Sequence, residues 1–227
     1  MEDALQVRLN AAGYDTDKSR LYLRNYEKYF APFRGENRSV AILELGVFRG
    51  GSPLLWRHYF PGGAVVGLDI NPCDVPDPTG RIKVYQGWQE DVELLDRIRN
   101  EAAPDGFDIV IDDASHLAAP TSTSFWRLFD HLRPGGVCVI EDWRVGYWDK
   151  WADGARFDMP GRMDRIVAKM FKAETRFPSH DYGLVGFVKG LVDELGMDAI
   201  THPKRDSMVP HQRADRKATI DALESCQ

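Results

Sequence analysis

Short apolar runs alternate with amphipathic stretches along most of this chain. Five runs have the length of a strand and carry almost only apolar side chains: residues 39–47, 64–70, 82–87, 107–115 and 137–143. Such uniform strands are typical of a sheet that is covered on both faces. Between them the spacing predicts helices over 52–59, 89–101 and 121–132, and the last of these ends at the stop signal Arg133-Pro134-Gly135-Gly136.

This alternation of strand and helix predicts the fold class. It implies βαβ units with right-handed crossovers, so we expect an α/β chain with a Rossmann-like, doubly wound, mostly parallel sheet and helices on both faces. The main domain is expected over residues 39–201, with helices near 160–175 and 184–195 and a short strand over 197–201. Residues 202–227 are interpreted as a charged C-terminal tail with one further helix over 214–224.

An aromatic and charged segment precedes the first strand. Apolar and aromatic residues recur there at helical spacing: Leu21, Tyr22, Asn25, Tyr26 and Tyr29. This pattern predicts an amphipathic helix laid over the sheet. We therefore expect residues 1–38 to form an N-terminal helical cover.

Composition narrows the class of protein. The 227 residues are 43% hydrophobic, which suits one α/β domain with appendages. A formal net charge of -6 argues against nucleic acid as the main partner. Three cysteines without C-x-x-C spacing indicate neither a disulfide framework nor a zinc site. No signal-like leader or bilayer-length apolar run is present, so we expect a cytoplasmic protein with no membrane partner.

A glycine-rich turn joins the first predicted strand to the first predicted helix. Its spacing is E-x-G-x-x-x-G-G, with Gly46, Gly50 and Gly51, followed by Ser52 as the expected N-cap and Pro53 at the first helical position. Glycines here let the backbone approach a ligand closely. The pattern departs from the dinucleotide fingerprint G-x-G-x-x-G and suits a ligand without a pyrophosphate. A purely structural turn is the alternative.

The next two strands end in polar residues suited to a nucleoside. Asp69, at the tip of the second strand, can accept both hydroxyl groups of a ribose, or else cap the turn before Asn71. After the third strand, Trp88 could stack on a base while Gln89 or Asp91 contacts its edge. An exposed helix start would use the same residues.

Carboxylates are concentrated at the ends of the last two predicted strands. Asp112 and Asp113 end one strand, and Glu141 and Asp142 end the next. Carboxyl ends of parallel strands meet at one edge of a sheet, so four acids would repel one another there unless a cation offsets them. Mg²⁺ prefers such oxygen ligands. The alternative is that these acids cap helices or pair with arginines.

A histidine follows the first acidic pair at close spacing. His116 lies three positions after Asp113, and its ordinary pKa suits removal of a proton from a hydroxyl group that a metal has acidified. We therefore interpret His116 as a general base. A helix cap or a packed histidine is the alternative.

These motifs together resemble a known family. ILELGVFRGGS, VGLDI, QGWQED, IDDASH and IEDWRVGYW look like the metal-dependent, class I S-adenosylmethionine O-methyltransferases of the macrocin and mycinamicin sugar type, with relatives among cephalosporin hydroxylase-like proteins. The match covers about residues 13–148. Its specific part is D-D-A-S-H followed by E-D-x-x-x-x-Y-W.

The resemblance implies a role for each matching residue. It implies Mg²⁺ at Asp113, Glu141 and Asp142, with His116 as base. It implies S-adenosylmethionine against these residues: Glu44, Gly46, Ser52, Asp69, Gln89 and Asp112. The upstream segment 15–30 resembles a T-D-K segment, which implies that Thr16, Lys18 and Tyr22 or Tyr26 fold over the cofactor.

The sequence therefore predicts an enzyme that methylates a hydroxyl group of a small acceptor, most naturally a vicinal diol of a glycosylated natural product or glycan. The family resemblance implies a homo-oligomer. Other functions stay open: a catechol-type O-methyltransferase, a noncatalytic cofactor-binding partner protein, and a dinucleotide oxidoreductase, against which the glycine spacing counts.

Overall fold

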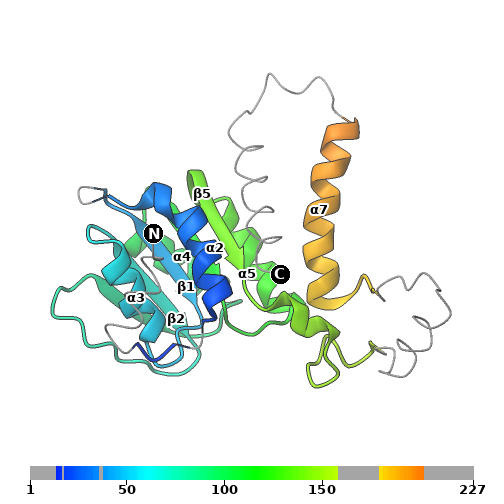
Figure 1. Cartoon of the computed structure of the whole chain (residues 1–227), viewed down its shortest axis with the longest axis horizontal. Helices are drawn as coiled ribbons and strands as arrows, with labels where there is room; N and C mark the ends of the chain where they lie inside the picture. Colours follow the sequence, from blue (N-terminus) through cyan, green and yellow to red (C-terminus); the bar gives the residue numbers. More distant parts are fainter. Residues whose placement is uncertain (1–13, 17, 36–37, 158–178, 202–227) are drawn as a thin grey trace.

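The computed structural model describes residues 14–16, 18–35, 38–157 and 179–201. Its centre is a five-stranded sheet in the order β3-β2-β1-β4-β5, in which every pair of neighbouring strands is parallel. The strands are β1 (Ala41–Leu45), β2 (Ala64–Asp69), β3 (Ile82–Gln86), β4 (Phe107–Asp112) and β5 (Leu132–Ile140). The predicted Rossmann-like α/β fold is confirmed (Figure 1).

Helices cover both faces of this sheet. They are α2 (Arg20–Phe30), η1 (Ala31–Phe33), α3 (Gly51–Tyr59), α4 (Val92–Ala102), α5 (Ala118–Phe129), η2 (Trp143–Tyr147) and α7 (Gly183–Thr201). Side chains of α2 and α3 pack in one apolar core, and those of α4, α5 and α7 pack in another. Figure 1 shows α7 standing beyond β5, where it contacts α5 and η2.

The alternation of side chains along each strand assigns residues to these two cores. In β1, Leu43 and Leu45 face the α4–α5 layer, while Ile42 faces the α2–α3 layer. Glu44 has the parity of Ile42 and is fully buried. A carboxylate therefore lies inside the α2–α3 layer, where it needs polar partners.

The N-terminal helix forms as predicted but turns a different stripe inward. Leu23, Tyr26 and Phe30 are its buried residues, whereas Leu21, which the spacing placed on the packed face, is 45% exposed. The helix begins after Ser19, whose hydroxyl accepts from the backbone N–H of Tyr22. This cap sets the phase of the helix, and the expected stripe is wrong by about one position.

Several predicted strands and helices extend beyond the observed ones. β4 ends at Asp112 rather than at residue 115, and β5 ends at Ile140, so Asp113, Glu141 and Asp142 follow the strands while Asp112 is the last residue of β4. α5 ends at Phe129, and the proline-glycine stretch lies inside β5 instead of stopping a helix. α4 begins only after its N-cap Asp91, which leaves Gln89 in the preceding turn. Polar residues at strand tips leave the sheet because they have partners outside it.

The last predicted strand is wrong. Residues 197–201 continue α7 as a helix, which runs through Gly196. A single glycine costs a helix only about 1 kcal/mol, which flanking helix formers offset. The helices predicted over 160–175 and 214–224, and the tail 202–227, lie outside the described residues. Among the described helices, none is long and apolar enough to cross a bilayer.

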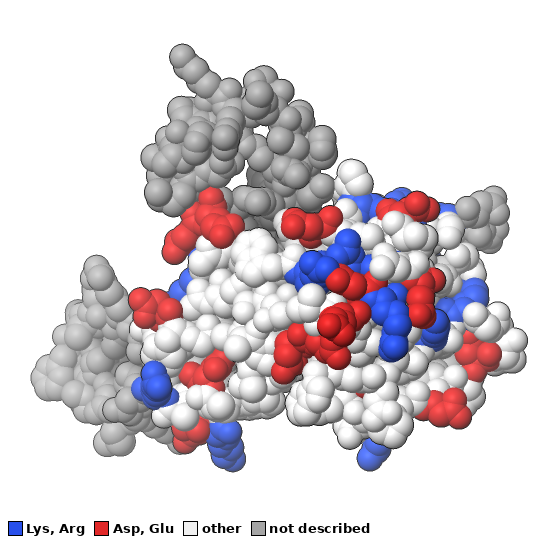
Figure 2. Space-filling view, turned by 180° about the vertical axis from the view of Figure 1, so that it is seen from behind, with Lys and Arg blue, Asp and Glu red and all other residues white. Residues whose placement is uncertain are grey.

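Charges of both signs are mixed on the surface. On the face seen in Figure 2, Lys and Arg side chains lie beside Asp and Glu side chains instead of forming a continuous basic field.

Candidate cofactor and cation site

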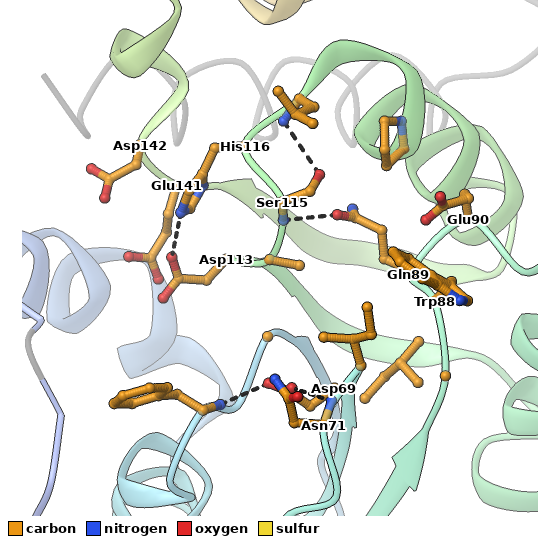
Figure 3. A pocket seen from close by; sticks show the side chains of 18 of the residues that line it. Asp69, Asn71, Trp88, Gln89, Glu90, Asp113, Ser115, His116, Glu141 and Asp142 are labelled. Atoms are coloured by element: carbon orange, nitrogen blue, oxygen red, sulfur yellow. Dashed lines mark hydrogen bonds and ion pairs between the residues drawn. The ribbon is translucent and has the colours of Figure 1, made fainter. Parts of the chain in front are cut away.

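A cavity of about 680 Å³ opens at the carboxyl ends of the strands. Its size lies within the range of small-molecule sites, roughly 300–1,000 Å³. Figure 3 shows Asp113, His116, Glu141 and Asp142 gathered on one side and Trp88, Gln89 and Glu90 on the opposite side. Asp69 and Asn71 line a third side. The cavity therefore has an acidic end and, opposite it, an end lined by the residues that the sequence predicted to face a nucleoside.

The glycine-rich turn brings two strand ends into direct contact. Gly46 has a φ of +83°, and a Cβ there would lie 2.1 Å from the carbonyl oxygen of Asp113. A Cβ at Gly51 would lie 2.0 Å from the carbonyl oxygen of Asp15, so the N-terminal segment crosses the turn at that point. Any larger side chain would separate these segments. The glycines thus hold the turn after β1 against Asp113 and under the N-terminal cover.

The N-cap predicted for α3 is wrong. Gly50, in a left-handed conformation, is the N-cap, and the helix starts at Gly51. The hydroxyl of Ser52 donates to Glu44 Oε2 at 2.6 Å, and Trp56 Nε1 donates to the same oxygen at 3.1 Å. The buried carboxylate of Glu44 takes the hydroxyl that would otherwise cap the helix, because an unpartnered buried charge is far more costly.

Asp69 lines the cavity and also organises the turn beside it. Its Oδ2 accepts from the backbone N–H groups of Val47 at 3.0 Å and Phe48 at 2.9 Å. Its Oδ1 accepts from the N–H of Asn71 at 2.9 Å. Each carboxylate oxygen has two lone pairs, so Asp69 keeps acceptor capacity toward the cavity. The geometry combines the two interpretations of Asp69, as ligand residue and as turn cap.

Asp112 is buried behind the cavity wall. It accepts from Gln89 Nε2 at 3.0 Å and from the hydroxyl of Ser124 at 3.3 Å, and burial raises its pKa to about 6. The side-chain oxygen of Gln89 in turn accepts from the N–H of Ser115 at 2.9 Å. Asp112 therefore fixes Gln89, and through it the turn that carries Asp113 and His116.

Lys18 extends from the N-terminal cover into the acidic end. Its Nζ lies 2.5 Å from Glu141 Oε1, 2.8 Å from Asp113 Oδ2 and 3.2 Å from Glu44 Oε1, and its side chain is only 2% exposed. Burial by itself lowers the pKa of Lys18, but the three carboxylates outweigh burial and hold that pKa well above its ordinary value. The hydroxyl of Tyr26 also donates to Glu141.

A second group of potential ligands lies beside the first and shares Asp113. Ligand atoms of Asp113, His116 and Asp142 all lie within 4.8 Å of one another. Nε2 of His116 is 3.9 Å from Asp113 Oδ1, and the ring of Trp151 meets the histidine edge-on at 5.4 Å. The hydroxyl of Tyr22 donates to Asp142 Oδ1 at 2.5 Å. The two carboxylates of this group suit a hard divalent cation, and the imidazole lies beside them.

The structure brings most of the predicted residues to one cavity. Nine line it: Lys18, Tyr22, Gly46, Asp69, Gln89, Asp113, His116, Glu141 and Asp142. Four others lie outside its lining: Thr16, Glu44, Ser52 and Asp112. The last three support residues that do line it. Thr16 accepts, through its hydroxyl, from the N–H of Lys18 at 3.4 Å.

Sequence reasoning missed two contacts. It assigned Lys18 to the cofactor and did not foresee the lysine among the acids, because 95 and 123 residues separate it from Asp113 and Glu141. It also did not place Trp151 against His116. No local motif signals either contact. Only the excess of negative charge could have pointed to Lys18, since the two acidic motifs at the strand ends contain four acids and no lysine.

The chain is a parallel α/β domain with a cavity outside the carboxyl ends of its strands, which is where open α/β sheets bind their ligands. No protein-family model matches the chain. The chain is similar in sequence to curated O-methyltransferases. It is 45% identical over 131 residues to mycinamicin VI 2''-O-methyltransferase of Micromonospora griseorubida, covering 55% of this chain and 32% of the relative. It is 35% identical over 178 residues to demethylmacrocin O-methyltransferase of Streptomyces fradiae, covering 75% and 39%.

A solved structure agrees with this relationship. MycE methyltransferase from the mycinamycin biosynthetic pathway, in complex with Mg and SAH, superposes with a TM-score of 0.64 and 34% identity. The match covers 86% of this chain and 46% of that one. The same enzyme with Mg, SAH and mycinamycin VI gives a TM-score of 0.63. The chain thus spans less than half the length of these relatives.

Proposed function

We propose that this chain acts as an S-adenosylmethionine-dependent, Mg²⁺-assisted O-methyltransferase on a sugar hydroxyl of a glycosylated natural product. The observation that carries the proposal is the meeting of Asp113, His116 and Asp142 at one end of a cavity whose other end holds Asp69 and Gln89. The homologous methyltransferases, and MycE bound to Mg and SAH, support the same chemistry.

The donor set fits a divalent cation. Carboxylate oxygens of Asp113 and Asp142 converge there, and Glu141 lines the same end of the cavity. These three residues would hold Mg²⁺, with water or acceptor oxygens completing its shell. A bound Mg²⁺ would supply Lewis acidity that lowers the pKa of a coordinated sugar hydroxyl.

The remaining residues position the reactants. Gly46, Asp69 and Gln89 would hold the cofactor, with Tyr22 of the cover closing over it. His116 would take the proton of the acceptor hydroxyl while that oxygen forms its bond to the methyl group and the carbon–sulfur bond breaks. Trp151 packs against the imidazole and restricts its orientation. Because the methyl donor is already activated, positioning is the main contribution of the protein.

Metal removal tests this proposal. The protein should transfer label from S-adenosylmethionine to members of a glycoside panel with Mg²⁺, lose that transfer in EDTA, and regain it when Mg²⁺ is restored. A phenol panel run in parallel separates sugar from catechol-type acceptors. Light scattering on the same sample measures the homo-oligomer that we also propose. Transfer that EDTA leaves unchanged would contradict the assignment.

A variant of the proposed base tests the role of His116 in the same transfer assay. His116→Ala should lower turnover by roughly 10²- to 10⁴-fold, the usual contribution of a general base. Its affinity for S-adenosylmethionine, measured by calorimetry, should stay near that of the unchanged chain, because His116 lies at the acidic end. Full turnover in His116→Ala would refute the base assignment.

A further inference from the structure

Two candidate cation clusters lie side by side at the acidic end and share Asp113. The inner cluster consists of Glu44, Asp113 and Glu141, and the outer cluster consists of Asp113, His116 and Asp142. Both are groups of side chains that could hold a metal ion. In the structure, the ammonium group of Lys18 already lies within salt-bridge distance of all three acids of the inner cluster.

The chain holds Lys18 firmly in this position. On its N-terminal side, the carbonyl of Asp15 lies against Gly51, and the hydroxyl of Tyr14 is hydrogen-bonded to His58 of α3. On its C-terminal side, Ser19 caps α2, whose buried face packs in the core. These anchors fix the backbone on both sides of Lys18, so the remaining entropy cost is that of the side chain, and three ion pairs offset it. Lys18 is therefore built into the site.

The sum of formal charges at the acidic end explains why a lysine is placed there. When all four are ionised, Glu44, Asp113, Glu141 and Asp142 carry four negative charges. Burial raises the pKa of both Glu44 and Glu141, and the nearby Lys18 opposes that rise. One divalent cation and one sulfonium leave a single negative charge, and Lys18 offsets it. Acids buried together without enough positive charge repel one another strongly, so a site lacking Lys18 would need another cation.

We propose that Lys18 is a positioning residue that fills the inner cluster with a fixed positive charge and so directs the divalent cation outward to Asp113 and Asp142, beside His116. Lys18 and Tyr26 contact Oε1 of Glu141, so Oε2 is the oxygen that Glu141 would offer to the ion. This inference rests on the proposed function. It differs from a direct contact between Lys18 and the cofactor, which the family resemblance suggested, because an ammonium group and a sulfonium repel each other. The acids between them would have to screen that repulsion.

Counting bound Mn²⁺ tests the role of Lys18 without any acceptor. Electron paramagnetic resonance of free Mn²⁺ gives the number of ions bound per chain. We expect one Mn²⁺ in the unchanged chain and in Lys18→Arg. Lys18→Met should bind two, because the emptied inner cluster offers three carboxylates to a second ion. Lys28→Met, which removes an exposed lysine from the helix that follows Lys18, is the matched control and should bind one.

A compensating variant separates charge from shape. In Lys18→Met/Glu44→Gln the inner cluster loses one positive and one negative charge, so the count should return to one. If Lys18→Met is recovered unfolded, this double variant decides. A folded double variant that binds one Mn²⁺ supports the proposal, and one that binds two overturns it.

The outcomes distinguish the two levels of inference. One Mn²⁺ in both the unchanged chain and Lys18→Met, with equal affinity, would overturn the role of Lys18 and leave the proposed function standing. No Mn²⁺ bound by the unchanged chain would overturn the proposed function, and the role of Lys18 with it.

Discussion

At the scale of single residues, the site contains buried charges and strained backbone, both of which lower the free energy of unfolding unless partners compensate for them. Glu44, Asp112 and Lys18 are buried, and each is held by named partners. His116 and Asp142 have φ values of +54° and +49°, which residues with a Cβ adopt at a cost of about 1–2 kcal/mol. Buried charge and strained backbone coincide at one end of the cavity, as is typical of functional sites.

Gly46→Ala tests the contact between the two strand ends. The new Cβ would clash with the Asp113 carbonyl in addition to the cost of positive φ, so unfolding free energy should fall by roughly 3 kcal/mol. Affinity for Mn²⁺ should fall with it, because Asp113 must move. Urea denaturation and Mn²⁺ titration measure the two effects.

Gly80→Ala is the matched control for this substitution. Gly80 has a φ of +65°, and a Cβ there would meet nothing within 4 Å. It should lose only about 1 kcal/mol and keep its Mn²⁺ affinity. Equal effects of the two substitutions would show that the contact with Asp113 does not matter.

Residue types at the site could be predicted from sequence, but their partners could not. Asp69, Asp113, His116 and Asp142 follow apolar runs, and the topology of a parallel sheet brings such positions to one edge. The partner of an acid is set by packing between distant segments, as the contacts of Lys18 show. Which acids face the cavity and which lie behind it, such as Asp112, also depends on side-chain parity at a strand end. That parity changes when the boundary shifts by one residue.

At the scale of elements, the strands were predictable because buried parallel strands need uninterrupted apolar runs. Their ends were not, because polar residues at the tips follow local hydrogen bonds instead of a periodic pattern. The long helix α7 shows the same limit, since it continues to Thr201 where a helix end and a short strand were predicted.

One carboxylate connects two helices near the site. Asp153 Oδ2 accepts from the N–H of Ala118 at 2.7 Å, in the first turn of α5, and from the N–H of Leu184 at 2.8 Å, in the first turn of α7. The N-cap of α5, Leu117, makes no side-chain hydrogen bond of its own. A negative charge at two helix N-termini is favourable for both helices.

Asp153→Ala should therefore lower the free energy of unfolding by roughly 2 kcal/mol, about 1 kcal/mol for each helix start. Thermal and urea denaturation measure this loss. Asp149→Ala removes an exposed acid from the same segment and should change stability by less than about 0.5 kcal/mol. If the two variants are equally stable, Asp153 does not connect the helices.

At the scale of the whole molecule, the site lies between the sheet and the N-terminal cover. The cover contributes Lys18 and Tyr22 to the cavity, and the strand ends contribute the acids and His116. Neither part alone forms the acidic end together with Lys18, the residue that offsets its negative charge. The account therefore depends on one spatial claim, that a divalent cation at the acidic end lies next to the methyl group of the donor.

Paramagnetic relaxation measures that proximity directly. Bound Mn²⁺ speeds the relaxation of nearby protons, with an effect that falls steeply with distance. In the unchanged chain, Mn²⁺ should strongly accelerate relaxation of the S-methyl protons of bound S-adenosylmethionine relative to Mg²⁺. Asp113→Asn/Asp142→Asn should abolish this effect while still binding S-adenosylmethionine. If the chain binds both Mn²⁺ and S-adenosylmethionine and the S-methyl protons relax as they do with Mg²⁺, the cation and the donor are apart and the account is wrong.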